Sequence, residues 1–182
     1  AKASAQCDKL PENLNLEGCC KFSIIAADDT VKKVLDEFKD QKLPPAMMQC
    51  KMSEEMFKEY KLTKGDGVDK EAFLNHVENK VLEPIWKPIM KNAVEECYKG
   101  VSRKTDEIVK ELEDDPFNIK RDECNPIYMS IVTCIQLEAF ENCPKELWAN
   151  EKKCNDARTW ITECGDNVES LKQIIKAKKS KH

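Results

Sequence analysis

The residues best suited to specific chemistry are the cysteines, of which the 182-residue chain contains ten. No two of them form a C-x-x-C pair, and only two histidines, His76 and His182, accompany them. Zinc and iron–sulfur sites need clustered cysteine and histidine ligands, so we expect no metal centre. The even number instead favours a disulfide framework formed in an oxidising compartment, with cytosolic free thiols as the alternative. The ten are Cys7, Cys19, Cys20, Cys50, Cys97, Cys124, Cys134, Cys143, Cys154 and Cys164.

Catalytic constellations are poorly represented in the sequence. A serine or cysteine nucleophile needs a base within hydrogen-bond reach, and His76 is the only internal histidine. It lies in Phe-Leu-Asn-His-Val, with no G-x-S-x-G elbow and no flanking aspartate. The doublet Cys19-Cys20 prompts comparison with secreted helical phospholipases, but Lys21-Phe22-Ser23 stands where their histidine–aspartate pair would follow. The carboxylates fall on predicted solvent-exposed faces, so we expect neither an enzyme nor a cofactor.

The stretch GDGVDKEAF, which begins at Gly65, resembles part of a calcium-binding EF-hand loop. If Gly67 were the invariant sixth residue, the first, third and twelfth ligands would be Leu62, Lys64 and Phe73. None of these is an oxygen-bearing calcium ligand of that motif, so the calcium interpretation fails.

Charge and hydropathy exclude further classes of protein. The net charge is −4, so the chain lacks the excess of positive charge typical of proteins that bind nucleic acid. It contains no run of about 18 apolar residues, the length that a membrane-spanning helix needs. The start, AKASAQC, lacks a methionine and an apolar targeting segment, as expected of a mature secreted chain, and no N-x-S/T glycosylation acceptor is present. The basic end, KQIIKAKKSKH, is interpreted as a solvated terminus in preference to a membrane or anion site.

The sequence predicts that the elements carrying the cysteines are helices. Only five glycines and a recurrent three-to-four spacing of apolar residues predict an all-α domain without strands. A first helix follows Asp28-Asp29 and ends at Leu43-Pro44-Pro45, a second is short, and Asp69 caps a third after a glycine-containing turn. Their inward faces carry Val31, Val34, Leu35 and Phe38, then Met52, Met56, Phe57 and Tyr60, then Phe73, Val77 and Val81.

The remaining chain predicts five more helical segments. Pro84 and Pro88 open a helix that ends near Gly100, residues 102–114 form the next, and a central helix starts near Cys124. One helix begins at Pro144, and a last one follows it. Their apolar positions are Ile85, Trp86, Ile89, Met90, Ala93, Val94 and Cys97; Ile108, Val109 and Leu112; Leu147, Trp148, Trp160 and Ile161; and Val168, Leu171, Ile174 and Ile175.

The central segment is the most buried of these predicted helices, because no charged residue lies between Asn125 and Leu137 in a chain that is 35% charged. Nine residues of α-helix turn through about 900° and rise about 13 Å, so Cys134 and Cys143 face opposite ways. Disulfides require Cα atoms within about 7 Å, so each must reach a different neighbouring element.

The chain is also rich in large apolar side chains, with six methionines, six phenylalanines and three tryptophans. These residues could simply fill a core. A cavity, however, costs about 24 cal/mol per Å³ in packing, and disulfides contributing about 2–5 kcal/mol each could offset one of a few hundred Å³. Stapled helices can therefore enclose a pocket.

The cysteine order resembles that of the insect odorant-binding proteins, in particular their longer Plus-C group. Cys19-Cys20 supplies the N-terminal doublet, Cys124-x9-Cys134-x8-Cys143-Pro144 the middle signature, and Cys154 and Cys164 the extension. The turn LTKGDGVDKEAF adds a weaker similarity. The resemblance covers roughly Cys7 to Cys164 and implies a helical fold around an apolar cavity.

One departure affects the disulfides that the resemblance implies. Family members usually carry a cysteine in C-x3-C after the second family cysteine, whereas Lys51-Met52-Ser53-Glu54 follows Cys50, so one family bridge should be missing. Carried over by position, the other two family bridges join Cys50 to Cys134 and Cys97 to Cys143. The six other cysteines have no assigned partners, except that the adjacent Cys19 and Cys20 should take separate ones.

The sequence thus predicts one all-α domain, residues 1–182, of seven to eight helices, with a core of about 20–144 and a cysteine-rich extension of about 145–182. The function expected is a secreted carrier of small apolar ligands such as odorants; the alternative is a disulfide-rich interaction or structural protein with a solid core. A second copy, joined through terminal segments, and a membrane receptor are further partners left open. The predicted ligand-lining residues are Met56, Phe57, Phe73, Val77, Val81, Trp86, Ile89, Met90, Val94, Ile131, Ile135 and Phe140.

Overall fold

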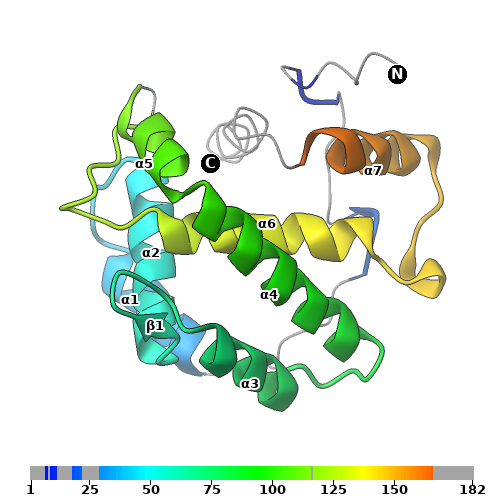
Figure 1. The fold of residues 1–182 in the computed structure, drawn as a ribbon, viewed down its shortest axis with the longest axis horizontal. Coiled ribbons are helices and arrows are strands. Elements are labelled where there is room, and N and C mark those ends of the chain that lie inside the picture. The colour runs from blue at the N-terminus through cyan, green and yellow to red at the C-terminus, as the bar shows by residue number, and fades with distance from the viewer. Residues whose placement is uncertain (1–6, 8, 12–17, 22–28, 116, 166–182) are drawn as a thin grey trace.

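The computed structural model describes residues 7, 9–11, 18–21, 29–115 and 117–165, and within these ranges it is predominantly helical (Figure 1). Seven α-helices are present there: α1 (Asp29–Phe38), α2 (Pro45–Glu59), α3 (Lys70–Lys80), α4 (Trp86–Arg103), α5 (Thr105–Glu113), α6 (Ile127–Glu141) and α7 (Lys152–Cys164). A 3-10 turn, η2 (Lys145–Leu147), precedes α7. The all-α prediction is confirmed, whereas the helix expected around Val168–Ile175 lies outside the described residues.

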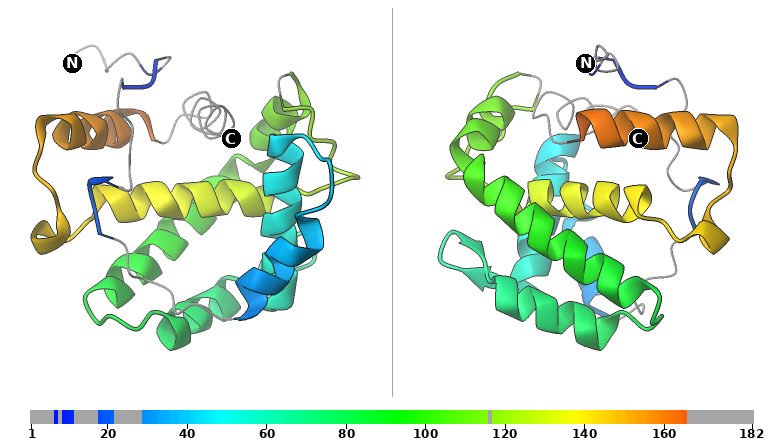
Figure 2. Two further views of the ribbon diagram at one scale, coloured as in Figure 1. Left: turned by 180° about the vertical axis from the view of Figure 1, so that it is seen from behind. Right: turned by 45° about the vertical axis from the view of Figure 1, so that its right-hand side comes forward.

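The helix α6 is the axis of the structure. It crosses α4 obliquely, α2 stands against its N-terminal half, and α7 lies beside its C-terminal half (Figures 1 and 2). Ten of its fifteen residues are buried, as its charge-free sequence predicts. The helix α3 packs against α4 and α1 packs against α2, which closes the helical layer around α6.

A small hairpin joins α2 to α3, and the expectation that strands would be absent is wrong at this point. Strand β1 (Thr63–Lys64) pairs antiparallel with β2 (Gly67–Val68). Gly65 takes a positive φ of 60°, which a glycine adopts at no steric cost at the first position of a two-residue loop. The predicted cap of α3 is confirmed, since the Ala72 amide donates to Asp69 Oδ1 at 3.0 Å.

Three predicted helix boundaries are corrected. The helix α2 is longer than expected because Pro45 is its first residue, where proline needs no backbone donor. Gly100 does not end α4, which continues to Arg103. The helix expected from Pro144 is instead interrupted between Leu147 and Lys152, because the backbone there pairs with the N-terminal segment: Lys21 N donates to Leu147 O, and Ala149 N donates to Cys19 O.

All ten cysteines form disulfides, but not with the partners that the family resemblance implied. The helix α6 is tied before its start, near its middle and beyond its end to three different elements. The bonds are Cys50–Cys124, Cys97–Cys134, Cys20–Cys143, Cys19–Cys154 and Cys7–Cys164.

The assignments Cys50–Cys134 and Cys97–Cys143 are therefore wrong. Cys124, which precedes α6, takes the partner on α2, and this leaves Cys134 to face Cys97 on α4. Cys143 then reaches the N-terminal segment at Cys20. The expectations that Cys134 and Cys143 reach different elements and that Cys19 and Cys20 take separate partners are confirmed.

Candidate functional site

A continuous hydrophobic cluster runs through the described part of the chain, and the section of it between α2, α3, α4 and α6 contains the predicted pocket residues. Of the twelve residues predicted to line a ligand pocket, eleven belong to this cluster or pack directly against it, and Met56, which is half-buried on α2, does not. Trp86 and Phe140 are fully buried, while Phe73 and Ile89 are partly exposed at its edge. The predicted residues within the cluster are Phe57, Val77, Val81, Trp86, Met90, Val94, Ile131, Ile135 and Phe140, and those that pack against it are Phe73 and Ile89.

Aromatic packing divides these residues into two groups. Phe57 lies at the meeting point of three elements, with its ring centroid 5.4 Å from that of Phe73 on α3 and 5.0 Å from that of Tyr128 on α6. Phe140 lies elsewhere, 5.0 Å from Trp148 in an edge-on contact near the disulfide-rich extension. Phe140 and Phe57, both predicted to line one pocket, therefore have different aromatic neighbours.

Tyr128 is a member of this site that the sequence analysis missed. It is 4% exposed and stacks at a tilt against Phe57, and its hydroxyl donates to Gly67 O at 3.1 Å. The signal was present, because Tyr128 lies three residues before Ile131 and so falls on the same face of α6. Burial raises the pKa of Tyr128, and the nearby Glu54 and Asp66 carboxylates raise it further.

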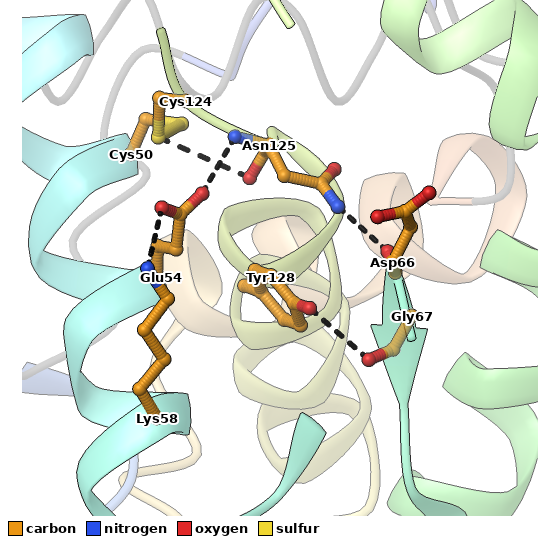
Figure 3. A network of polar contacts seen from close by, with 8 residues as sticks. All are labelled: Cys50, Glu54, Lys58, Asp66, Gly67, Cys124, Asn125 and Tyr128. Atoms are coloured by element: carbon orange, nitrogen blue, oxygen red, sulfur yellow. Dashed lines mark hydrogen bonds and ion pairs between the residues drawn. A yellow bond between two sulfur atoms is a disulfide. The ribbon is translucent and has the colours of Figure 1, made fainter. Parts of the chain in front are cut away.

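A polar network fixes the N-terminal end of α6 against this aromatic group (Figure 3). Glu54 on α2 accepts a hydrogen bond from the Asn125 amide at 2.7 Å and one from Lys58 at 3.2 Å. The Asn125 side chain caps α6 by accepting from Ile127 N at 3.1 Å, and it donates to Asp66 O of the hairpin at 2.6 Å. With the adjacent Cys50–Cys124 disulfide, these bonds hold α2, the hairpin and α6 in one geometry.

A separate groove lies between α4, α6 and the end of α7, with a volume of about 260 Å³. Its walls are mainly polar, and none of the twelve predicted ligand-lining residues contributes to it. The lining residues are Asn92, Glu96, Cys134, Leu137, Glu138, Glu141, Asn142, Ile161, Thr162 and Gly165. This groove is therefore distinct from the predicted apolar site.

Other kinds of site find no support within the described ranges. No group of three or more histidine, cysteine or acidic side chains could hold a metal ion there, and no helix described is long and apolar enough to cross a membrane. The ring of His76 packs with its centroid 4.4 Å from that of Tyr60.

Comparison with known proteins gives consistent matches. A family model described as AgamOBP47-like matches residues 22–160. The chain is similar to general odorant-binding protein 68 of Anopheles gambiae, with 23% identity over 93% of this chain and 80% of that protein. It is also 26% identical to odorant-binding protein 47 of Anopheles gambiae, over 63% of this chain and 51% of the relative.

Proposed function

The chain belongs to the AgamOBP47-like family of insect odorant-binding proteins, and from this premise we propose that it is a secreted carrier that binds a small apolar molecule reversibly in an internal pocket. The carrier makes and breaks no covalent bond. The relatives named for odorant binding and the five disulfides, which suit an oxidising compartment, support this proposal.

The observation that carries the proposal is the apolar cluster between α2, α3, α4 and α6. Phe57 is central to it, because it contacts the rings of Phe73 and Tyr128 from two other elements. Phe73 and Ile89 lie at the cluster's partly exposed edge, which is where we place ligand entry. Phe140 packs beside Trp148 and is assigned a peripheral role.

The expected affinity is modest. An odorant of about a dozen heavy atoms, at about 0.5 kcal/mol per atom, would bind with about 6 kcal/mol, which corresponds to a Kd of several tens of micromolar. Such an affinity allows both uptake and release.

A fluorescent apolar probe, N-phenyl-1-naphthylamine, tests this site through saturable binding and displacement by medium-chain alcohols. Val77→Phe adds bulk inside the cluster and should raise the Kd of the probe at least about tenfold, because overpacking leaves less room for a guest. The matched control is Val34→Phe on α1, which is equally buried but lies outside the predicted site, and it should change the Kd less than about twofold.

Two results would contradict the carrier. Probe binding that neither saturates nor responds to competitors would favour the solid-core interaction protein instead. Equal loss of probe binding in Val77→Phe and Val34→Phe, with native disulfides intact, would show that the site lies elsewhere in the protein.

A further inference from the structure

Tyr128 brings one polar atom into the aromatic group around Phe57. The two ring centroids lie 5.0 Å apart, and the Tyr128 hydroxyl reaches Gly67 O on β2 at 3.1 Å (Figure 3). Only 4% of Tyr128 is exposed, so little water competes for its oxygen. An occupant of the proposed site that packs against Phe57 therefore also meets the Tyr128 ring, whose edge carries this oxygen.

The direction of the Tyr128–Gly67 hydrogen bond follows from the chemistry of the two groups. A backbone carbonyl has no proton to give, so the phenol must be the donor, and this bond uses its single proton. The phenol oxygen can still accept a hydrogen bond. In the described part of the chain, the donors of the adjoining network are committed elsewhere, because the Asn125 side chain donates to Asp66 O and the Asn125 amide donates to Glu54. The Tyr128 oxygen therefore keeps acceptor capacity but has no proton left to offer.

The surroundings of the phenol maintain this arrangement. Burial raises the pKa of Tyr128, and the Glu54 and Asp66 carboxylates raise it further, so the proton stays on the phenol at neutral pH. The carbonyl that accepts the proton is also held in place, because Gly67 belongs to the β1–β2 hairpin and the adjacent Asp66 O accepts from Asn125 at 2.6 Å. The proton thus remains directed at the hairpin.

We infer that Tyr128 is the polar anchor of the apolar site and selects ligands that carry a hydrogen-bond donor, namely alcohols and phenols. This inference rests on the proposed carrier function and narrows it to a class of ligand. The ligand hydroxyl donates to the Tyr128 oxygen, while the hydrocarbon part packs against Phe57. An alcohol buried without a partner for its proton loses affinity, so an acceptor at this position decides whether alcohols are retained. Ketones and ethers, which only accept hydrogen bonds, gain nothing from this oxygen.

Displacement of N-phenyl-1-naphthylamine by ligands of equal heavy-atom count tests this selection in the disulfide-intact protein. The ligands are 2-phenylethanol, which can donate, acetophenone, which can only accept, and propylbenzene, which can do neither. Tyr128→Phe removes the oxygen and keeps the ring, so it should raise the Kd of 2-phenylethanol about three- to tenfold relative to that of propylbenzene, the effect of one neutral hydrogen bond. Acetophenone should follow propylbenzene. Any disturbance of the hairpin by the substitution cancels in these ratios, because it acts on all three ligands alike.

The matched control is Thr133→Val, which removes another buried hydroxyl from α6. Thr133 is 1% exposed, and its hydroxyl has no hydrogen-bond partner among the described residues. It lies five residues after Tyr128, which places it about 140° around the helix from the aromatic group. Thr133→Val should therefore leave the ratio of the Kd of 2-phenylethanol to that of propylbenzene unchanged.

Three results would overturn the inference. An unchanged ratio in Tyr128→Phe, with saturable probe binding retained, would refute the anchor and leave the carrier function standing, whereas absence of saturable binding in the wild type would refute both. Equal loss of affinity for acetophenone and 2-phenylethanol in Tyr128→Phe would show that the phenol donates its proton to the ligand, contrary to the selection proposed here. A loss confined to 2-phenylethanol in Thr133→Val, and absent from Tyr128→Phe, would assign the anchor to Thr133.

Discussion

The helical body, α1 to α6, and the C-terminal extension, η2 and α7, are held together by different means. The body contains two disulfides, Cys50–Cys124 and Cys97–Cys134, and a large continuous apolar cluster. The extension is bound to the N-terminal segment by three, Cys20–Cys143, Cys19–Cys154 and Cys7–Cys164, and it presents one helix of 13 residues. Isolated helices of that length are marginal in water, so the three disulfides add to the stability that α7 gains by burying one face against the body.

The contrast between body and extension indicates which part of the protein each disulfide stabilises. Bridges inside the body connect helices that already pack together, so they add to a cooperative unit. Bridges of the extension attach two short segments, residues 18–21 and 145–165, whose buried side chains join the apolar cluster through one face of α7 only. We therefore expect global unfolding to report on the body and local opening to report on the extension.

The largest effect should come from truncating the core of the body. Trp86 is fully buried, and Trp86→Ala should lower the free energy of unfolding by about 3–5 kcal/mol because it leaves a large cavity. Guanidinium denaturation with disulfides intact measures this change. Trp160→Ala, in the buried face of α7, is the comparison variant and should have a smaller global effect while accelerating exchange of α7 amides. Equal global losses would mean that both regions unfold as one unit.

Removing one disulfide from the body and one from the extension should destabilise different parts of the protein. Cys97→Ala/Cys134→Ala opens a bridge between α4 and α6 and should lower the global free energy of unfolding by about 2–4 kcal/mol. Cys19→Ala/Cys154→Ala leaves the Cys20–Cys143 disulfide in place, so the loop that the lost disulfide had closed is only about a dozen residues long. The free energy of local unfolding of α7 should fall by about 2–3 kcal/mol.

Hydrogen exchange distinguishes these two outcomes. In the Cys19→Ala/Cys154→Ala protein, α7 amides should exchange about 30-fold or more faster while α4 and α6 keep their protection. Loss of protection throughout α6 in that variant would show that the extension stabilises the body, contrary to the division made here.

A smaller effect is expected from the polar network that holds the start of α6. Glu54 accepts from the Asn125 amide at 2.7 Å and its side chain is 22% exposed, so Glu54→Ala should cost about 1–2 kcal/mol. Glu55→Ala, one residue along α2, controls for loss of a helical carboxylate and should cost less than about 0.5 kcal/mol. Similar values for both variants would show that the Asn125 bond does not stabilise the body.

The sequence predicted the body better than the extension, for a physical reason. Apolar residues at helical spacing determine which face of a helix is buried, so the inward positions of α3 and α6 could be read directly from Val77, Ile131 and Ile135. The break between Leu147 and Lys152 could not, because it arises from pairing with Cys19 and Lys21, which lie more than 120 residues away. Local propensity carries no information about that partner.

The disulfide partners could not be predicted from the sequence for a related reason. Helical spacing gave the direction of Cys134 relative to Cys143, but the partner of each depends on how α2 and α4 are placed around α6. The lining of the apolar site was predicted by residue type and did not include Tyr128, whose hydroxyl is satisfied in the core by Gly67 O, an acceptor that the sequence does not place there. The division into a core of 20–144 and an extension within one domain stays a prediction.

The smallest expected effect concerns ion pairs, which also differ between the two regions. In the body, Glu78 of α3 accepts a hydrogen bond from Lys91 of α4 and feels the second charge of Lys87, and both lower the pKa of Glu78. In the extension, Lys152 pairs with Asp156 one turn along α7, at 2.7 Å, which raises the pKa of Lys152. The first pair joins two helices, whereas the second joins residues of a single helix.

A carboxyl group with a lowered folded-state pKa stabilises the fold above its unfolded pKa, and this contribution is lost as pH falls through the folded pKa. Lys91→Ala should therefore return the Glu78 pKa toward its ordinary value and slightly accelerate exchange in both α3 and α4. Lys152→Ala should affect α7 alone. An NMR titration of the Glu78 carboxyl carbon measures the first effect, and an unchanged titration midpoint in Lys91→Ala would show that the link between α3 and α4 does not form in solution.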